Sequence, residues 1–221
     1  MPRDLPLRLR GRSGSHFTRV ARIVAHALGV PLQLEVVHDL MGLDPAAYGS
    51  HPGLKLPTLQ LAEGPLFGTD NICRALAEIA GRSGDPRVVL GGPSASVLAR
   101  SAQELVWQAM STQVQLVVGL RVAKLPAENV FFEKAKAGML GSLAWLEARA
   151  GEVIAELPEP RDLSLFEVTL FCLLEHLGFR PSVSLEPFPA LRGFAATFGS
   201  RESARGTPYR FDPPPTPATD R

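Results

Sequence analysis

The chain has 221 residues, 45% of them hydrophobic, and a formal net charge of +1. This length allows one domain or two. The balance of 23 basic and 22 acidic residues gives no electrostatic reason to expect a nucleic-acid partner or an acidic membrane surface. No apolar run approaches the roughly 18 residues that a membrane-spanning helix needs. We therefore expect neither a nucleic-acid nor a membrane partner.

The start of the chain and its cysteines bear on where the protein works. The first residues, MPRDLPLRLRGR, mix proline with charge and do not resemble a secretory signal. The two cysteines, Cys73 and Cys172, lie far apart and show no metal-binding spacing. Such isolated thiols are typical of a reducing compartment. The sequence predicts a cytoplasmic protein with reduced thiols and no metal site.

The first elements in chain order predict a β-α-β unit. Residues 5–9 alternate between leucine and other residues, as in a short strand. From Ser15 the apolar residues recur with a helical period, and Gly29 ends that helix. Residues 32–37, LQLEVV, predict a second strand. The connection between the strands is a single helix, so we expect them to be parallel and the crossover right-handed.

The next elements predict a hairpin and a helix. Residues 56–61 (LPTLQL) and 65–67 (PLF) predict two strands joined by a turn. Residues 68–81, GTDNICRALAEIAG, predict a helix whose last glycine serves as the C-terminal cap. We expect Ile79 to lie on the buried face of this helix. The order of elements up to this point is βαβ–ββα.

The rest of the chain predicts a linker, a set of helices and a tail. Residues 81–95 are rich in Gly and Pro and predict the linker. Ser164 and Glu167 have the spacing of a capping box at the start of the most apolar helix. The proline-rich end cannot sustain a helix and is expected to be extended or disordered. The predicted helices span residues 94–120, 128–150, 162–179 and 187–199.

These elements divide the chain into three parts. Residues 1–82 predict an α/β domain, residues 93–205 an all-α domain, and residues 206–221 a proline-rich tail. Each of the first two parts has enough apolar residues at regular spacing to form its own core.

Four short stretches resemble the cytosolic glutathione transferases, bacterial members included. HPGLKLPTL is similar to the family's Asn-Pro-x-Gly-Lys-Val-Pro-x-Leu stretch, and LFGTDNICRAL to its Glu-Ser-x-Ala-Ile-x-Arg-Tyr-Leu stretch. LSLFEVTL resembles its Ser-x-x-Asp capping motif, and RESARGTPYRFD its Arg-Pro-Ser ending. The resemblance covers nearly the whole chain. It implies a thioredoxin-like N-terminal domain, an all-α C-terminal helical domain and a homodimer.

The resemblance also implies a binding site for glutathione in the first domain. Pro57 would follow a cis peptide bond, as in the family, and the backbone of Leu56 would pair with the peptide part of glutathione. Lys55 could reach the glycine carboxylate, or it could be a solvated loop charge.

A second part of the implied site is the start of the helix at GTDN. Thr69 takes the place of the family's serine, where unsatisfied N–H groups and the helix dipole favour the γ-glutamyl carboxylate. It is also expected to cap the helix. Gly68 stands where the family has Glu or Gln, and Asp70 could pair with the α-amine instead or only complement the helix dipole.

The turn after the first strand is the predicted thiol site. A free thiol, with a pKa near ~8.5, is only slightly ionised at neutral pH, and a hydroxyl at a helix N-terminus can stabilise the thiolate. Alignment with the zeta-class serine stretch favours Ser15, and a shift of one residue favours Ser13. His16 is a third candidate donor. The alternative roles are an ordinary N-cap for Ser15 and a partly exposed first-turn position for His16.

The sequence therefore predicts an enzyme that binds glutathione as co-substrate, without another cofactor. It would activate the thiol as thiolate and transfer it to a small apolar electrophile, as in detoxification. The alternative is a non-catalytic binding or interaction protein of the same family. This alternative is motivated by Gly68 and by the absence of Tyr and Cys from the first turn.

Overall fold

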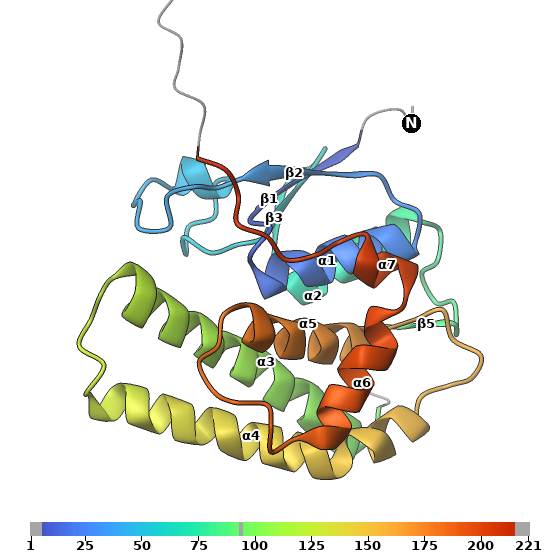
Figure 1. Cartoon of the computed structure of the whole chain (residues 1–221). Helices are drawn as coiled ribbons and strands as arrows, with labels where there is room; N and C mark the ends of the chain where they lie inside the picture. The colour runs from blue at the N-terminus through green and yellow to red at the C-terminus, as the bar shows by residue number, and fades with distance from the viewer. Residues whose placement is uncertain (1–5, 93–94, 215–221) are drawn as a thin grey trace, which may run out of the picture. The chain divides into compact units, whose positions relative to one another are not determined.

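The computed structural model describes residues 6–92 and 95–214, which fall into two compact units (Figure 1). The first unit joins the chain up to Gly81 with the segment from Gly206 onwards, and the second comprises Arg82–Arg205. The C-terminal segment, expected as a separate tail, thus groups with the first unit as far as Pro214, and the rest of that tail lies outside the described residues. No described helix has the length and apolar character needed to cross a membrane.

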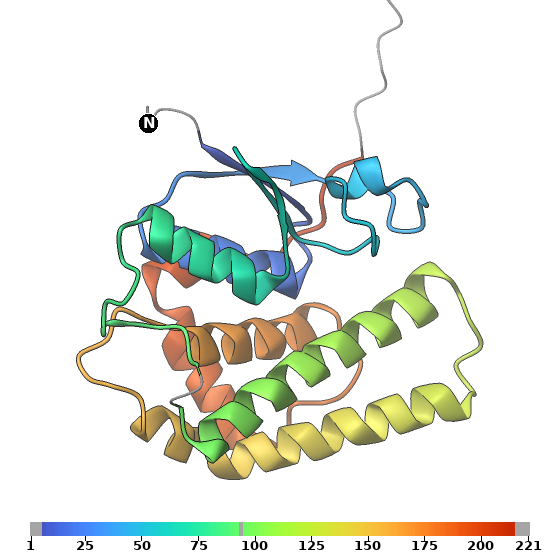
Figure 2. The ribbon, with the colours of Figure 1, turned by 180° about the vertical axis from the view of Figure 1, so that it is seen from behind.

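The first unit has the predicted βαβ–ββα order. Its sheet has the strand order β2-β1-β3-β4. Strand β2 is parallel to β1, β3 is antiparallel to β1, and β4 is antiparallel to β3. Helices α1 and α2 lie on one face of this sheet (Figures 1 and 2). The elements are β1 (Leu7–Gly11), α1 (His16–Ala27), β2 (Leu32–Val36), the 3-10 helix η1 (Pro45–Tyr48), β3 (Thr58–Leu61), β4 (Gly64–Phe67) and α2 (Thr69–Ile79).

The core of the first unit lies between the sheet and its two helices. Leu9 and Leu59 on the strands and Ile23 and Ile72 on the helices are fully buried. Each such side chain stabilises the fold by about 1.5–3 kcal/mol. Ile79, expected to be buried, is 43% exposed because it is the last residue of α2. The spacing of apolar residues along a helix does not show at which residue its buried face ends.

The second unit is helical, as predicted, with one small addition. Strands β5 and β6 form a parallel pair that the sequence analysis did not predict, because two residues show no period. Helices α3 and α4 form a hairpin (Figure 2), and α5 packs against α3 and α6. The elements are β5 (Val88–Val89), α3 (Val97–Val117), the π-helix η2 (Val118–Val122), α4 (Val130–Ala155), β6 (Leu163–Ser164), α5 (Leu165–Phe179), α6 (Pro189–Gly199) and α7 (Glu202–Arg205).

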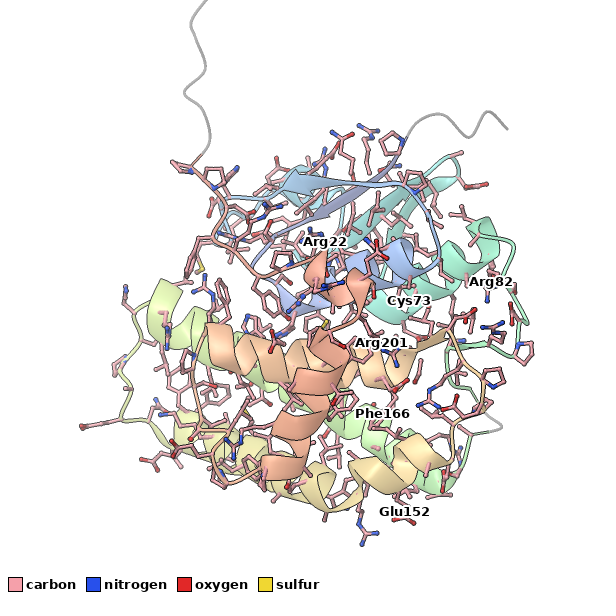
Figure 3. All side chains as sticks on the ribbon, turned by 45° about the vertical axis from the view of Figure 1, so that its right-hand side comes forward. Arg22, Cys73, Arg82, Glu152, Phe166 and Arg201 are labelled. Atoms are coloured by element: carbon pink, nitrogen blue, oxygen red, sulfur yellow. The ribbon has the colours of Figure 1, made fainter. Side chains whose placement is uncertain are left out.

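Arginine–carboxylate pairs fasten the segment expected as a linker to the start of α5. The carboxylate of Asp162 accepts hydrogen bonds from Arg82 at 2.8 Å and from Arg87 at 2.5 Å. Arg82 is labelled in Figure 3. These bonds lie next to the pairing of Val88 with Leu163. Part of the expected linker is therefore built into the second unit.

The start of α5 keeps half of the predicted capping box. The Ser164 hydroxyl accepts from the amide of Glu167 at 3.4 Å. The carboxylate of Glu167 is bound by Arg161, at 2.8 and 3.1 Å. The two side chains are only 5% and 8% exposed. Removing Arg161 would leave the buried Glu167 carboxylate with only Arg201, whose Nη2 atom lies 3.7 Å from it.

Candidate functional site

Three segments of the first unit leave its sheet at the same end. The strand register pairs Arg10 with Thr58 and Thr58 with Phe67. The turn after β1, the loop before β3 and the start of α2 are therefore neighbours across the sheet. The structure thus brings together at one edge the residues predicted for the site: Ser13, Ser15 and His16 from the turn, Lys55, Leu56 and Pro57 from the loop, and Thr69 and Asp70 from α2.

The turn after β1 is closed by contacts between its own residues. A Cβ atom added at Gly11 would lie 2.5 Å from Thr18 Oγ1, so the turn has no room for a larger residue. The amide of Arg12 donates to Thr18 Oγ1 at 3.3 Å. The amide of Thr18 donates to Ser15 Oγ, also at 3.3 Å. Thr18 is fully buried, so these bonds fix where Ser15 lies.

The three candidates for the thiol site differ in their surroundings. Ser15 is the N-cap of α1, and its hydroxyl accepts one bond and retains a hydrogen to donate. Ser13 is buried, and its amide is bound by a carboxylate described below. His16, for which partial exposure was the alternative, is 1% exposed, and its ring meets that of Phe17 edge-on at 4.8 Å between centroids.

A carboxylate that sequence reasoning missed lies at this turn. Asp212 accepts from the Ser13 amide at 3.0 Å through Oδ2 and at 3.4 Å through Oδ1. The Nε atom of Arg12 lies 3.9 Å from the same Oδ2. Nearby, the Arg19 guanidinium lies over the Tyr209 ring, 4.2 Å from its centroid. No local pattern could have revealed these contacts, because Ser13 and Asp212 are 199 positions apart.

The loop before β3 matches the part implied for the peptide of glutathione. The Leu56–Pro57 peptide bond is cis. Pro57 is buried and Leu56 is half-buried. Within the described part of the chain, Leu56 makes no backbone hydrogen bond, so its amide and carbonyl are available to a ligand. Lys55 is exposed.

His51 holds the start of this loop, a role that the sequence analysis did not assign. Its Nδ1 accepts from the Gly53 amide at 3.0 Å. Its ring lies 4.3 Å from the ring of Phe67, between centroids. Desolvation lowers the pKa of His51, with a smaller contribution from the charge of Lys55. The neutral ring, which accepts at Nδ1, is therefore the form that suits this loop.

The start of α2 has a glycine in place of a capping side chain. Gly68 is the N-cap, with φ of +87°, and no described side chain caps the first turn. The expected capping role of Thr69 is therefore wrong, because Thr69 is the first helical residue and lies one position past the cap. Asp70 binds Arg74 at 2.9 and 3.3 Å. The first-turn amides of α2 suit an anion.

The described residues contain no cluster of His, Cys, Asp and Glu suited to a metal ion. Cys73 and Cys172 are both buried, and neither is in a disulfide.

The comparisons with known proteins agree with this arrangement. Residues 14–79 match the family model described as glutathione S-transferase, N-terminal domain. This stretch begins in the turn after β1 and ends with α2. The N-terminal part of the chain is therefore similar to a glutathione S-transferase N-terminal domain. A search of curated proteins found no match.

Solved structures with the same fold include several glutathione transferases. A family member from Pseudomonas fluorescens, with bound glutathione, has a TM-score of 0.77 at 21% identity, covering 92% of this chain and 99% of that chain. A glutathione S-transferase from Methylobacterium radiotolerans, in complex with glutathione sulfonate, has a TM-score of 0.75 at 20% identity, covering 98% of this chain and 99% of that chain. A glutathione transferase from Populus trichocarpa has a TM-score of 0.70 at 16% identity, covering 91% of this chain and 97% of that chain. These similarities confirm the predicted fold class.

Proposed function

We propose that this protein binds glutathione at the described edge of the first unit, lowers the pKa of its thiol and transfers the thiolate to a small apolar electrophile. One observation carries the proposal. A serine-capped α1, a loop with a cis proline and an uncapped start of α2 meet at one end of a single sheet. The solved structures of similar fold with bound glutathione or glutathione sulfonate support it.

Each part of this edge suits one part of the tripeptide. The first-turn amides of α2 and the Thr69 hydroxyl suit the γ-glutamyl carboxylate, because the helix dipole favours an anion there. The backbone of Leu56 suits the central peptide unit. The exposed Lys55 suits the glycine carboxylate through a charge-assisted hydrogen bond. Asp70 shares its carboxylate with Arg74, so we assign it only a secondary contact with the α-amine.

The thiolate is assigned first to Ser15. Lowering the thiol pKa by ~2 units requires about 2.7 kcal/mol. A hydroxyl hydrogen bond to an anion supplies ~1.5–3 kcal/mol, and a helix N-terminus adds ~0.3–1 kcal/mol. Ser15, as the N-cap of α1, combines both contributions. Ser13 is the second choice and His16 the third.

The test combines the thiolate absorbance of bound glutathione with conjugation of chlorodinitrobenzene. Ser15→Ala is expected to raise the thiol pKa by ~1–2 units, because one hydrogen bond to the anion is lost. Its dissociation constant for S-methylglutathione, which has no thiol, should stay unchanged. Lys55→Ala is the matched control, since it should weaken binding without moving the thiol pKa. A thiol pKa that moves with Ser13→Ala but not with Ser15→Ala would transfer the role to Ser13.

The alternative is a non-catalytic interaction protein, and the carboxylate of Asp212 at the turn favours it. Negative charge beside the thiol site disfavours a thiolate. Failure of the unmodified protein to bind S-methylglutathione would refute the transferase proposal. Binding without any depression of the thiol pKa would favour the alternative.

We also propose a homodimer, which the resemblance to the glutathione transferases implies, and a cytoplasmic location, which the sequence predicts. Support comes from large apolar side chains that are exposed along the α3–α4 hairpin, since monomeric proteins rarely expose large apolar patches. Sedimentation of the unmodified protein and of Phe131→Glu tests the dimer, which the charged variant should weaken. The large apolar side chains exposed on this hairpin are Val97, Val114, Val122, Leu125, Val130, Phe131 and Leu140.

A further inference from the structure

The described residues 206–214, which we call the C-terminal strap, are anchored to the rest of the first unit by Tyr209 and Asp212. Thr207 is buried, Tyr209 lies under the guanidinium of Arg19, and the side chain of Asp212 is only 4% exposed. The strap runs along α1 in Figure 1. Its last anchor is a carboxylate placed in the turn where the proposed function needs a thiolate.

The carboxylate of Asp212 occupies a donor that would suit another anion. Both of its oxygens lie within 3.4 Å of the Ser13 amide nitrogen. An amide just before the N-terminus of α1 favours negative charge, because the helix dipole adds to the hydrogen bond. A donated N–H has one hydrogen, so Asp212 and a thiolate cannot both receive a full bond from Ser13.

The surroundings of Asp212 are rich in positive charge. Arg12 of the turn lies beside its carboxylate. Arg22 of α1, labelled in Figure 3, is close enough for Asp212 to raise its pKa. Burial, Arg210 of the strap and Arg19 of α1 outweigh this effect and lower the pKa of Arg22. Asp212 supplies negative charge to this cluster, and the cations would remain if it were neutralised.

We propose that the Asp212 carboxylate competes with the glutathione thiolate for the Ser13 amide, so that the seated strap restrains thiolate formation at this turn. This inference rests on the proposed function. While the strap is seated, the amide is engaged and a negative charge lies at Ser13, two positions before Ser15. When Asp212 is removed or displaced, the amide becomes available and Arg12 and Arg22 favour an incoming anion.

The variant that tests this competition is Asp212→Asn. Asparagine removes the charge and leaves only a weaker, neutral acceptor for the Ser13 amide, so a thiolate can compete for that amide more easily. The thiol pKa of bound glutathione, followed by thiolate absorbance against pH, should fall by about one unit, which is a ~10-fold gain in thiolate below the pKa. Glu63→Gln is the matched control, because it removes one negative charge at the exposed turn between β3 and β4 and should leave the thiol pKa unchanged.

A second variant separates the role of the strap from the folding of the turn. Tyr209→Ala removes an anchor without changing a charge, and it should lower the thiol pKa in the same direction as Asp212→Asn. If Asp212→Asn does not fold, Tyr209→Ala decides the question. A thiol pKa that stays the same or rises in the folded variants would overturn the inference.

Calorimetry with S-methylglutathione distinguishes this failure from failure of the proposed function. If all variants bind S-methylglutathione and the thiol pKa does not respond, the competition is refuted while glutathione binding stands. If the unmodified protein does not bind it, the proposed function and this inference both fail.

Discussion

Replacing Gly11 by alanine should strain the turn that carries the candidate hydroxyls. The new Cβ atom would lie 2.5 Å from Oγ1 and 2.6 Å from Cγ2 of Thr18, far inside van der Waals contact. Thr18 is fully buried, so its side chain cannot swing into solvent. Either the turn shifts or Thr18 changes rotamer, and the second choice breaks the bond from the Arg12 amide to Thr18 Oγ1.

The expected loss of stability follows from these two contributions. Overpacking a filled site costs ~1–3 kcal/mol, and a partly buried amide that loses its acceptor costs a further ~1–3 kcal/mol. Gly11→Ala should therefore lower the free energy of unfolding by about 2–6 kcal/mol. That is a large share of the ~5–15 kcal/mol typical of folded proteins. Urea denaturation followed by circular dichroism measures it.

A double-mutant cycle with Thr18→Ala isolates the steric cause. Alanine at position 18 removes both of the atoms that clash most closely, so the double variant should be more stable than the sum of the single changes predicts. Gly141→Ala is the control, since no atom lies within 4 Å of its added Cβ and a helical alanine should stabilise by ~0.5–1 kcal/mol. An unchanged midpoint for Gly11→Ala, or zero coupling to position 18, would refute the reasoning.

Three further predictions concern other parts of the molecule. Arg161→Met should cost up to ~3–5 kcal/mol in urea denaturation, because the buried Glu167 carboxylate keeps only its longer contact with Arg201, and Glu167→Gln in addition should recover part of it. Burial lowers the pKa of His51. Its contribution to the order of the loop is therefore present above the unfolded pKa of ~6.5 and is lost as pH falls through the lower folded pKa. Binding of S-methylglutathione should weaken at acid pH, and it should weaken less in His51→Gln. Thr69→Val should weaken that binding ~5–10-fold by removing one hydrogen bond to the carboxylate, at ~1–1.5 kcal/mol, without moving the thiol pKa.

Local patterns predicted most of the fold because its elements are built from near neighbours in sequence. The alternation at residues 5–9 and the helical period after Ser15 led to the correct βαβ unit. Where a prediction was wrong, the residues that decide the structure show no periodic pattern. Thr69 was expected to cap α2, but the chain turns one residue earlier, at Gly68, and the strands β5 and β6 are too short to show a pattern.

The sequence by itself determined which residues are candidates for the site. The tertiary structure decided how these residues are arranged and which charged groups lie beside them. Ser13, Ser15, Pro57 and Thr69 could be singled out from motifs. Only the register of the sheet places their segments at one edge. The carboxylate at the Ser13 amide comes from Asp212, at the other end of the chain. Periodicity reports on neighbours a few residues apart, whereas a contact of this kind exists only once the chain has folded back on itself.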